Sequence, residues 1–206
     1  MLDEAIITRS IECWQNQFRT IYGRRNLYTS SASGIVLQMG REMSLLNKSV
    51  NTGRPDDPQA LAGLGARIFA LGNFLGEDVG FLLARKYPGR CPYCDEPNEC
   101  ACPLAVRKKH LATDKVATKF ANNWHIDEAQ RMLARLYGRA NARSGREGIL
   151  RHLNEEYFEL ARALSERDPE SLQEELADVF AWWIGYITLR DIPSVSGLLY
   201  AHYPDV

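Results

Sequence analysis

The chain has 206 residues, enough for one large domain or two small ones. Its 25 Lys and Arg residues balance 26 Asp and Glu residues, and the net charge of −1 argues against a dedicated nucleic-acid coat protein. A hydrophobic fraction of 45% with 25% charged residues excludes disorder over the whole chain. No apolar run reaches the roughly 18 residues of a membrane span. The N-terminus carries acids where a secretory signal would carry Lys or Arg, so we expect a cytoplasmic protein with no membrane partner.

Apolar residues at helical spacing predict helices along both halves of the chain. In the second half they predict a helix near 147–165 and another near 169–188, and Asp168-Pro169 supplies a cap and a first-turn proline for the latter. The first half repeats this order, with helices expected near 34–49 and 58–75. Each half also begins with a long helix and ends with a short one. Because no stretch alternates as a strand does, we expect an all-α fold.

Four of the five cysteines lie in one short segment between the two halves. The segment reads Cys91-Pro-Tyr-Cys94 and then Cys100-Ala-Cys102, and its prolines keep it out of a helix. Without a secretory signal, metal binding is favoured over disulfides, and four thiolates suit tetrahedral Zn²⁺. We therefore expect a structural zinc site, with a redox pair or unligated thiols as the alternatives. The fifth cysteine, Cys13, lies on a helical pattern and is expected to be a small buried hydrophobic residue.

A basic connector follows the cysteines. Its positive residues are Arg107-Lys108-Lys109-His110, Lys115 and Lys119. A solvated helix face is the simplest interpretation, and a nucleic-acid contact beside the zinc loop is the alternative. Because the connector lacks the interleaved aromatic residues of single-strand binders, nucleic acid is not the expected partner.

The two ends of the chain match each other in order, which indicates an internal repeat. Four stretches correspond at offsets between 111 and 116 residues; they include Ile21-Tyr-Gly-Arg-Arg-Asn26 with Leu136-Tyr-Gly-Arg-Ala-Asn141, Gly34-Ile35 with Gly148-Ile149, Asp57-Pro58 with Asp168-Pro169, and Tyr87-Pro88 with Tyr203-Pro204. We interpret residues 1–88 and 126–206 as two copies, with the zinc loop and basic connector at 89–125 between them. Since two small helical units rarely bury enough surface alone, we expect them to pack as one bundle.

Two pairs of acids mark the second copy. Glu156 and Glu159 share one helical face, and Glu175 and Asp178 share another, because each pair has a spacing of three residues. Both pairs border apolar stripes, so packing of the two helices should bring the four carboxylates together. Such a group would repel strongly unless a cation neutralised it, and oxygen ligands select Mg²⁺ or Mn²⁺. The alternative is a chance pairing of acids on solvated helix faces.

The first copy keeps this frame but not these acids. Glu42 stands opposite Glu156, whereas Leu45, Leu64 and Arg67 stand opposite the other three acids. The pattern indicates one metal site retained and one lost. Drift of exposed positions is the alternative interpretation.

The ExxE and ExxD pairs, in the contexts Asn-Glu-Glu-Tyr-Phe-Glu-Leu and Glu-Glu-Leu-Ala-Asp-Val, resemble those of the MazG-like all-α nucleoside triphosphate pyrophosphohydrolases, a superfamily that includes the dimeric dUTPases. The resemblance covers residues 126–206 well and residues 1–88 as a degenerate copy. It implies a (d)NTP substrate cleaved to (d)NMP and pyrophosphate, with Mg²⁺ held by Glu156, Glu159, Glu175 and Asp178. It also implies that the tandem copies form a fused pseudo-dimer with one site, and that the chain could pair further as a homodimer.

Four further residues are candidates for binding the substrate. Trp182 shares the face of Asp178 and is placed to stack on a nucleobase, unless it fills the core in competition with Trp183. Arg139 and Asn141 precede the second acidic helix and would reach phosphate or base, or else cap the first helix. Arg67 would reach the site from the degenerate copy, or else fill its vacant metal position.

Three functions remain open from the sequence. The first is a Mg²⁺-dependent nucleotide pyrophosphohydrolase, which would remove unwanted nucleotides or act as a dUTPase does. The second is a non-catalytic nucleotide sensor with the same fold. The third is a zinc-stabilised adaptor that binds nucleic acid or protein through the loop and connector. The intact acids of the second copy favour the first function.

Overall fold

The computed structural model describes residues 9–100, 102 and 112–204, and this part of the chain is all-α, as predicted. The helices are α2 (Ile11–Thr29), α3 (Ala32–Asn51), α4 (Pro58–Leu75), α5 (Val79–Lys86), α6 (Asp114–Ala121), α7 (Ile126–Glu166), α8 (Pro169–Leu189) and α9 (Val195–His202). Within the described residues, no helix has both the length and the apolar character needed to cross a membrane.

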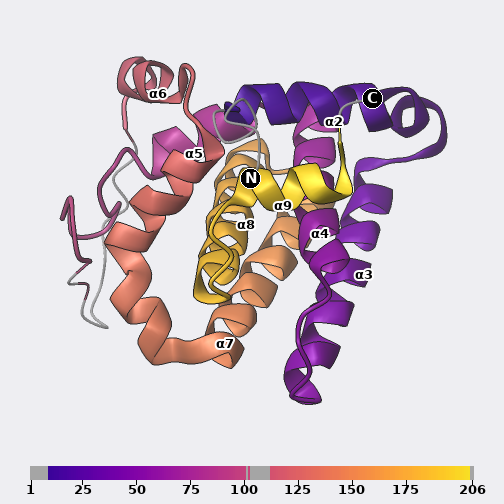
Figure 1. Cartoon of the computed structure of the whole chain (residues 1–206). Helices are drawn as coiled ribbons and strands as arrows, with labels where there is room; N and C mark the ends of the chain where they lie inside the picture. Colours follow the sequence, from indigo (N-terminus) through magenta and orange to yellow (C-terminus); the bar gives the residue numbers. More distant parts are fainter. Residues whose placement is uncertain (1–8, 101, 103–111, 205–206) are drawn as a thin grey trace.

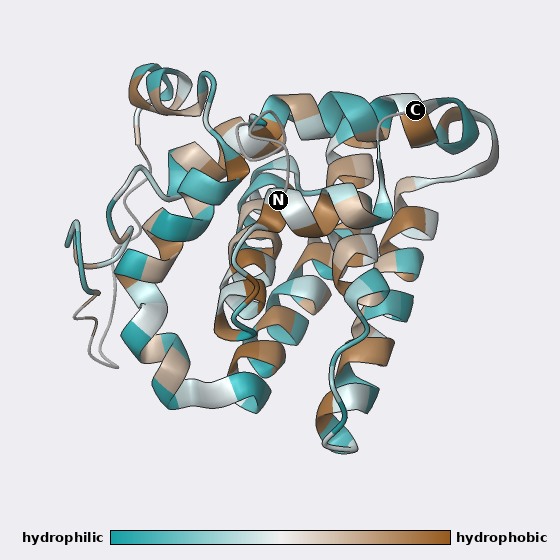
Figure 2. Cartoon of the chain, viewed as in Figure 1, coloured by the Kyte–Doolittle hydropathy of each residue, from teal (hydrophilic) through white to brown (hydrophobic). Residues whose placement is uncertain are grey.

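The helices pack as one bundle in which α8 lies along α7, and α4 lies against both α3 and α2 (Figure 1). Hydrophobic residues gather along the inner faces of the central helices (Figure 2). The largest side chains of this core are fully buried and include Trp14, Phe18, Phe69, Phe180 and Trp183. A single core therefore joins both halves of the chain.

Helix α7 contains a sharp bend, so the two helices predicted in this range form one continuous bent helix. The helix runs down one side of the molecule and turns back sharply (Figure 1). The bend is at Gly145, whose φ of 65° and ψ of −178° are not helical and favour glycine. The second half thus has a helix on either side of Gly145, which correspond to α2 and α3 in the first half. The expected helix near 147–165 is the part of α7 that follows the bend.

Each half sends its short last helix onto the other half. Helix α5 packs on α8, and α9 packs on α4. Gln15 accepts a hydrogen bond from the Val79 backbone N–H, and Gln130, 115 residues later, accepts one from the Val195 backbone N–H. This recurrence of one contact at the offset of the sequence matches supports the internal repeat.

Asp56, just before α4, joins the two halves through polar contacts. Its buried carboxylate accepts hydrogen bonds from Ser49 at 2.6 Å, from Arg146 at 2.6 Å and from Arg190 at 2.8 Å. Tyr186 also donates to it at 3.1 Å. Two arginines and a tyrosine of the second half thus share one carboxylate of the first half, which fixes how the halves pack.

Candidate metal and nucleotide site

Three carboxylates meet where α8 packs on the second part of α7. Oxygen atoms of Glu156, Glu175 and Asp178 all lie within 4.8 Å of one another. Glu175 is 9% exposed and Asp178 is 5% exposed, so water screens these charges poorly. The helical spacing and the apolar stripes on either side therefore place three of the four predicted acids together.

Glu159 lies outside this close group. Its side chain is exposed on α7, one turn after Glu156. Its negative charge nevertheless contributes to the raised pKa values of Glu156 and Glu175. Glu159 therefore borders the group on the solvent side.

The electrostatics of the group favour a cation. Burial, and next the charge of Asp178, raise the pKa of Glu156 to about 8. The same two causes raise the pKa of Glu175 above its ordinary value. One buried oxygen of Glu175, Oε2, has no hydrogen-bond partner in the structure. Ionised together, these groups need a counter-charge, and an all-oxygen donor set suits Mg²⁺ or Mn²⁺.

Lys86 and Tyr87, at the end of α5, reach Asp178 from the other half of the chain. The Lys86 ammonium, 2% exposed, forms a buried ion pair with the Asp178 carboxylate and lies 3.9 Å from the Glu174 carboxylate. The Tyr87 hydroxyl donates to Asp178 Oδ1 at 2.6 Å. Neither role is predicted from the sequence pattern. The available signal was the matched Tyr87-Pro88 pair at the end of each copy, which marks a common position but does not show what it contacts.

Trp182 lies at the edge of the carboxylate group. Its indole N–H donates to Glu156 Oε1 at 3.2 Å, and its half-buried ring stacks on His152 with centroids 4.8 Å apart. Trp183 occupies the core instead, at 0% exposure, and donates to the Leu61 carbonyl. Trp183 therefore takes the core position, and Trp182 lies beside the acids.

The structure does not bring the two candidates that precede the bend to the carboxylates. The exposed Arg139 pairs with Glu99 of the cysteine loop, at 2.9 Å. Asn141 is half-buried and faces Gly185, two helical turns beyond Asp178 on α8. Arg139 thus supports the loop, whereas Asn141 contacts α8 away from the carboxylates.

Arg67 lies in the position of the first half that corresponds to Asp178. Its guanidinium is 4.6 Å from the centroid of the Tyr22 ring, and its charge acts on Glu42 and Tyr203. Tyr22 and Tyr203 meet edge to face at 6.4 Å, and Tyr87 and Tyr137 make the same kind of contact between the halves at 6.2 Å. Arg67 therefore lies apart from the carboxylate group.

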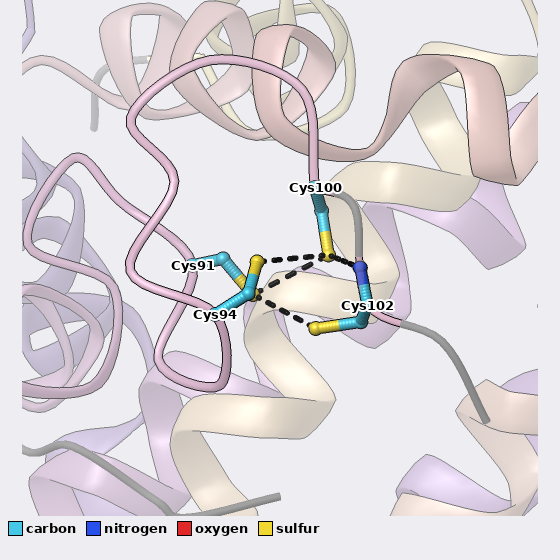
Figure 3. A group of neighbouring side chains, drawn as sticks. All are labelled: Cys91, Cys94, Cys100 and Cys102. Carbon is cyan, nitrogen blue, oxygen red and sulfur yellow. Dashed lines mark hydrogen bonds between the residues drawn. The ribbon is translucent and has the colours of Figure 1, made fainter. Parts of the chain in front are cut away.

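The four clustered cysteines form a second candidate metal site (Figure 3). Their Sγ atoms all lie within 4.8 Å of one another, and none forms a disulfide. Cys91 Sγ is 3.4 Å from Cys100 Sγ and 3.7 Å from Cys102 Sγ, and Cys94 Sγ is 3.8 Å from Cys100 Sγ. Four converging sulfurs match the donor set of structural zinc.

The cysteine loop is attached to the first part of α7. The Cys100 N–H donates to the Leu136 carbonyl at 2.8 Å, and Arg135 donates to the Pro97 carbonyl. Residues 107–110 of the basic connector lie outside the described residues, whereas Lys115 and Lys119 lie exposed on α6, in agreement with a solvated helix face. The fifth cysteine, Cys13, is exposed, so the expectation that it is buried was wrong.

Comparison with known proteins identifies one segment of the chain. Residues 144–192 match the family model of the MazG nucleotide pyrophosphohydrolase domain. No curated protein and no solved structure matches the chain. The matched segment begins at the bend of α7 and contains all four predicted acids. The chain therefore contains a MazG-like nucleotide pyrophosphohydrolase segment at residues 144–192, within an all-α fold.

Proposed function

We propose that the protein is a divalent-metal-dependent nucleoside triphosphate pyrophosphohydrolase that converts a (d)NTP and water to a (d)NMP and pyrophosphate, and so removes unwanted nucleotides. The observation that carries this proposal is the meeting of three carboxylates within 4.8 Å inside the MazG-like segment. Lys86 balances only one of these carboxylates, so a bound cation would stabilise the remaining negative charge.

The donor chemistry fits Mg²⁺ or Mn²⁺. Glu156, Glu175 and Asp178 would hold the ion, with Glu159 as the fourth ligand at the solvent side. The unpartnered Oε2 of Glu175 is a buried acceptor that an ion would satisfy. When bound, such an ion neutralises phosphate charge and favours attack on phosphorus.

The side chains of the chain divide the remaining tasks. The attacking water adds to the α-phosphorus, the α–β bridging oxygen leaves with pyrophosphate, and one carboxylate takes the proton that the water loses. Lys86 and Tyr87 hold Asp178 in place for this task. Trp182, fixed by its hydrogen bond to Glu156, offers an aromatic face to a nucleobase.

The four cysteines would hold a structural Zn²⁺. Their loop joins the end of α5 to the first part of α7 through Cys100 and Leu136. Since Tyr87 lies four residues before Cys91, a bound zinc ion would also limit the movement of Tyr87 and Lys86. Its expected role is to position these two residues and not to react.

The chain is proposed to be a fused pseudo-dimer with a degenerate copy at 1–88, a zinc loop and connector at 89–125 and the MazG-like copy at 126–206. The exchange of α5 and α9 between the halves supports this division. Only the second half has the acids, so we expect one metal site per chain. A cytoplasmic location, and a homodimer of the whole chain, are part of the same proposal.

Pyrophosphate release from a panel of NTPs and dNTPs tests the proposal. Release is expected with Mg²⁺, and Glu175→Gln should abolish it while leaving the protein folded by circular dichroism. The exposed Glu166→Gln on α7 is the matched control and should keep full activity. The absence of release from every nucleotide, in folded and zinc-loaded protein, would instead favour the nucleotide sensor or the adaptor.

A further inference from the structure

A cavity of about 160 Å³ opens between α2 and α4 in the first half of the chain. Its walls are mostly apolar and include Phe18, Leu27, Ala70 and Phe74, while Gly23 leaves one wall without a side chain. The volume is comparable to that of a protein cavity of about 150 Å³ that accommodates a single benzene ring. The cavity is therefore large enough for one aromatic or heteroaromatic ring.

Polar groups at the cavity allow it to recognise a ring with hydrogen-bonding atoms. Asn26 is 6% exposed and lines the cavity. Asn73 and Arg19 lie on the same lining and are joined by a hydrogen bond of 3.2 Å. An apolar pocket with a few fixed carboxamide and guanidinium groups is typical of sites that bind small heterocyclic ligands.

A cationic side chain lies next to this cavity along the same two helices. Arg67 is one helical turn before Ala70 on α4, and its guanidinium covers Tyr22, which is one turn before Asn26 on α2. The Tyr22 ring in turn stacks on Phe18, with centroids 6.2 Å apart. Neither Tyr22 nor Arg67 lines the cavity itself, but each lies one turn from a residue that does, which places the guanidinium beside the cavity.

The Arg67 guanidinium has unused donors. Among the residues that the structure describes, it forms no hydrogen bond or ion pair, and its Nε is buried without a partner. The charge of Arg67 acts on Glu42, whose carboxyl lies against Gly63. A half-buried guanidinium with free N–H groups is suited to a phosphate, which it binds through paired hydrogen bonds.

The two halves therefore differ in how they can receive an anion. The second half presents three close carboxylates and needs a metal ion before phosphate can approach. The first half has an arginine at the position of Asp178 and needs none. We propose that the cavity between α2 and α4, together with the neighbouring Arg67, binds a pyrimidine nucleoside monophosphate without a divalent metal. The base would lie in the cavity and the phosphate at Arg67.

This site is separate from the carboxylate group of the second half, and we expect it to retain its ligand unchanged because Leu45, Leu64 and Arg67 replace three of the four acids. It goes beyond the proposed hydrolysis, because it gives the degenerate half a binding role of its own. The cavity residues Ala70 to Phe74 follow Arg67 by three to seven residues on α4, a rise of roughly 5–11 Å, which a mononucleotide can span. A bare aromatic acid or inorganic phosphate would not occupy both the cavity and the position at Arg67.

Calorimetric titration of zinc-loaded, Mg²⁺-free protein with UMP, CMP and inorganic phosphate tests this proposal. Both nucleotides are expected to bind once per chain and more tightly than phosphate. Arg67→Met keeps the packing on Tyr22 and should weaken binding by about tenfold to hundredfold, the range for a lost hydrogen bond to a charged group. Gly23→Leu should fill the cavity and abolish binding of the nucleotides while leaving that of phosphate.

The matched control for Gly23→Leu is Gly138→Leu, the corresponding position of the second half, where a side chain meets nothing within 4 Å. It should bind UMP as the wild type does. Glu175→Gln should also keep this binding while losing hydrolysis, which separates failure of this proposal from failure of the proposed enzyme. No Mg²⁺-free binding by the folded wild type, or binding that survives both Arg67→Met and Gly23→Leu, would overturn the proposal.

Discussion

Replacing Glu156 by Gln is expected to remove most of the pH dependence of stability from the Mg²⁺-free protein. Burial, and next the charge of Asp178, raise the pKa of Glu156 from 4.5 to about 8 in the folded chain. The unfolded chain loses this proton near pH 4.5, whereas the folded chain keeps it until about pH 8. The folded state therefore binds more protons in this window, and the free energy of unfolding falls as the pH rises through it.

The size of the effect follows from this window. One extra bound proton changes the free energy of unfolding by about 1.4 kcal/mol per pH unit. Between about pH 5.5 and about pH 7.5, the loss is thus about 2.7 kcal/mol at most. Because Glu156 is only half-buried, contact with water reduces the expected loss to about 1.5 kcal/mol.

Urea denaturation at the two pH values, followed by circular dichroism, measures this loss. Glu156→Gln should flatten the dependence, whereas the exposed Glu166→Gln should leave it as in the wild type. Mg²⁺ should stabilise the wild type more at the higher pH, because it binds the deprotonated carboxylates. An unchanged dependence in Glu156→Gln would refute the assignment of a buried, protonated carboxyl to this residue.

Three other changes have expected outcomes. Asp56→Ala leaves two arginines of the other half without their carboxylate, so urea denaturation should show a loss of about 3 kcal/mol. Gly65→Ala would place a Cβ 2.3 Å from Trp183 and should cost about 1–3 kcal/mol in the same assay, whereas Gly138→Ala should stabilise the protein by about 0.5–1 kcal/mol. Elemental analysis should find one zinc per chain, which Cys94→Ser should remove together with several degrees of melting temperature.

Helix bounds were predictable where the signal was local. The predicted helix at 58–75 is α4, because the Asp57 side chain accepts from the Gln59 N–H at the start and Gly76 takes a left-handed φ of 77° at the end. The break at Gly145 was less visible. The glycine lies among helix-forming residues, so only the packed structure shows that the chain reverses there.

The four acids show which side-chain positions helical spacing predicts and which it does not. Spacing placed Glu175 and Asp178 on one buried face, and both are buried. It placed Glu156 and Glu159 together as well, yet Glu159 is exposed. The width of the buried stripe on α7 depends on where α8 packs against it, and this is a property of two helices rather than of one sequence pattern. The exposed Cys13 on α2 has the same explanation, because its neighbour Trp14 occupies the inward face.

Lys86 and Tyr87 could not be assigned from the sequence because their partner is 91 to 92 residues away. Nothing local to α5 indicates that it leaves its own half and packs on α8. The first half nevertheless contributes to the carboxylate group, because the end of α5 supplies the ammonium and hydroxyl groups that hold Asp178. Separated from the first half, the second half would keep its carboxylates and lose the positive charge that neutralises them. The two halves are thus unequal in chemistry and inseparable in structure, since one supplies the acids and the other the groups that keep those acids in place.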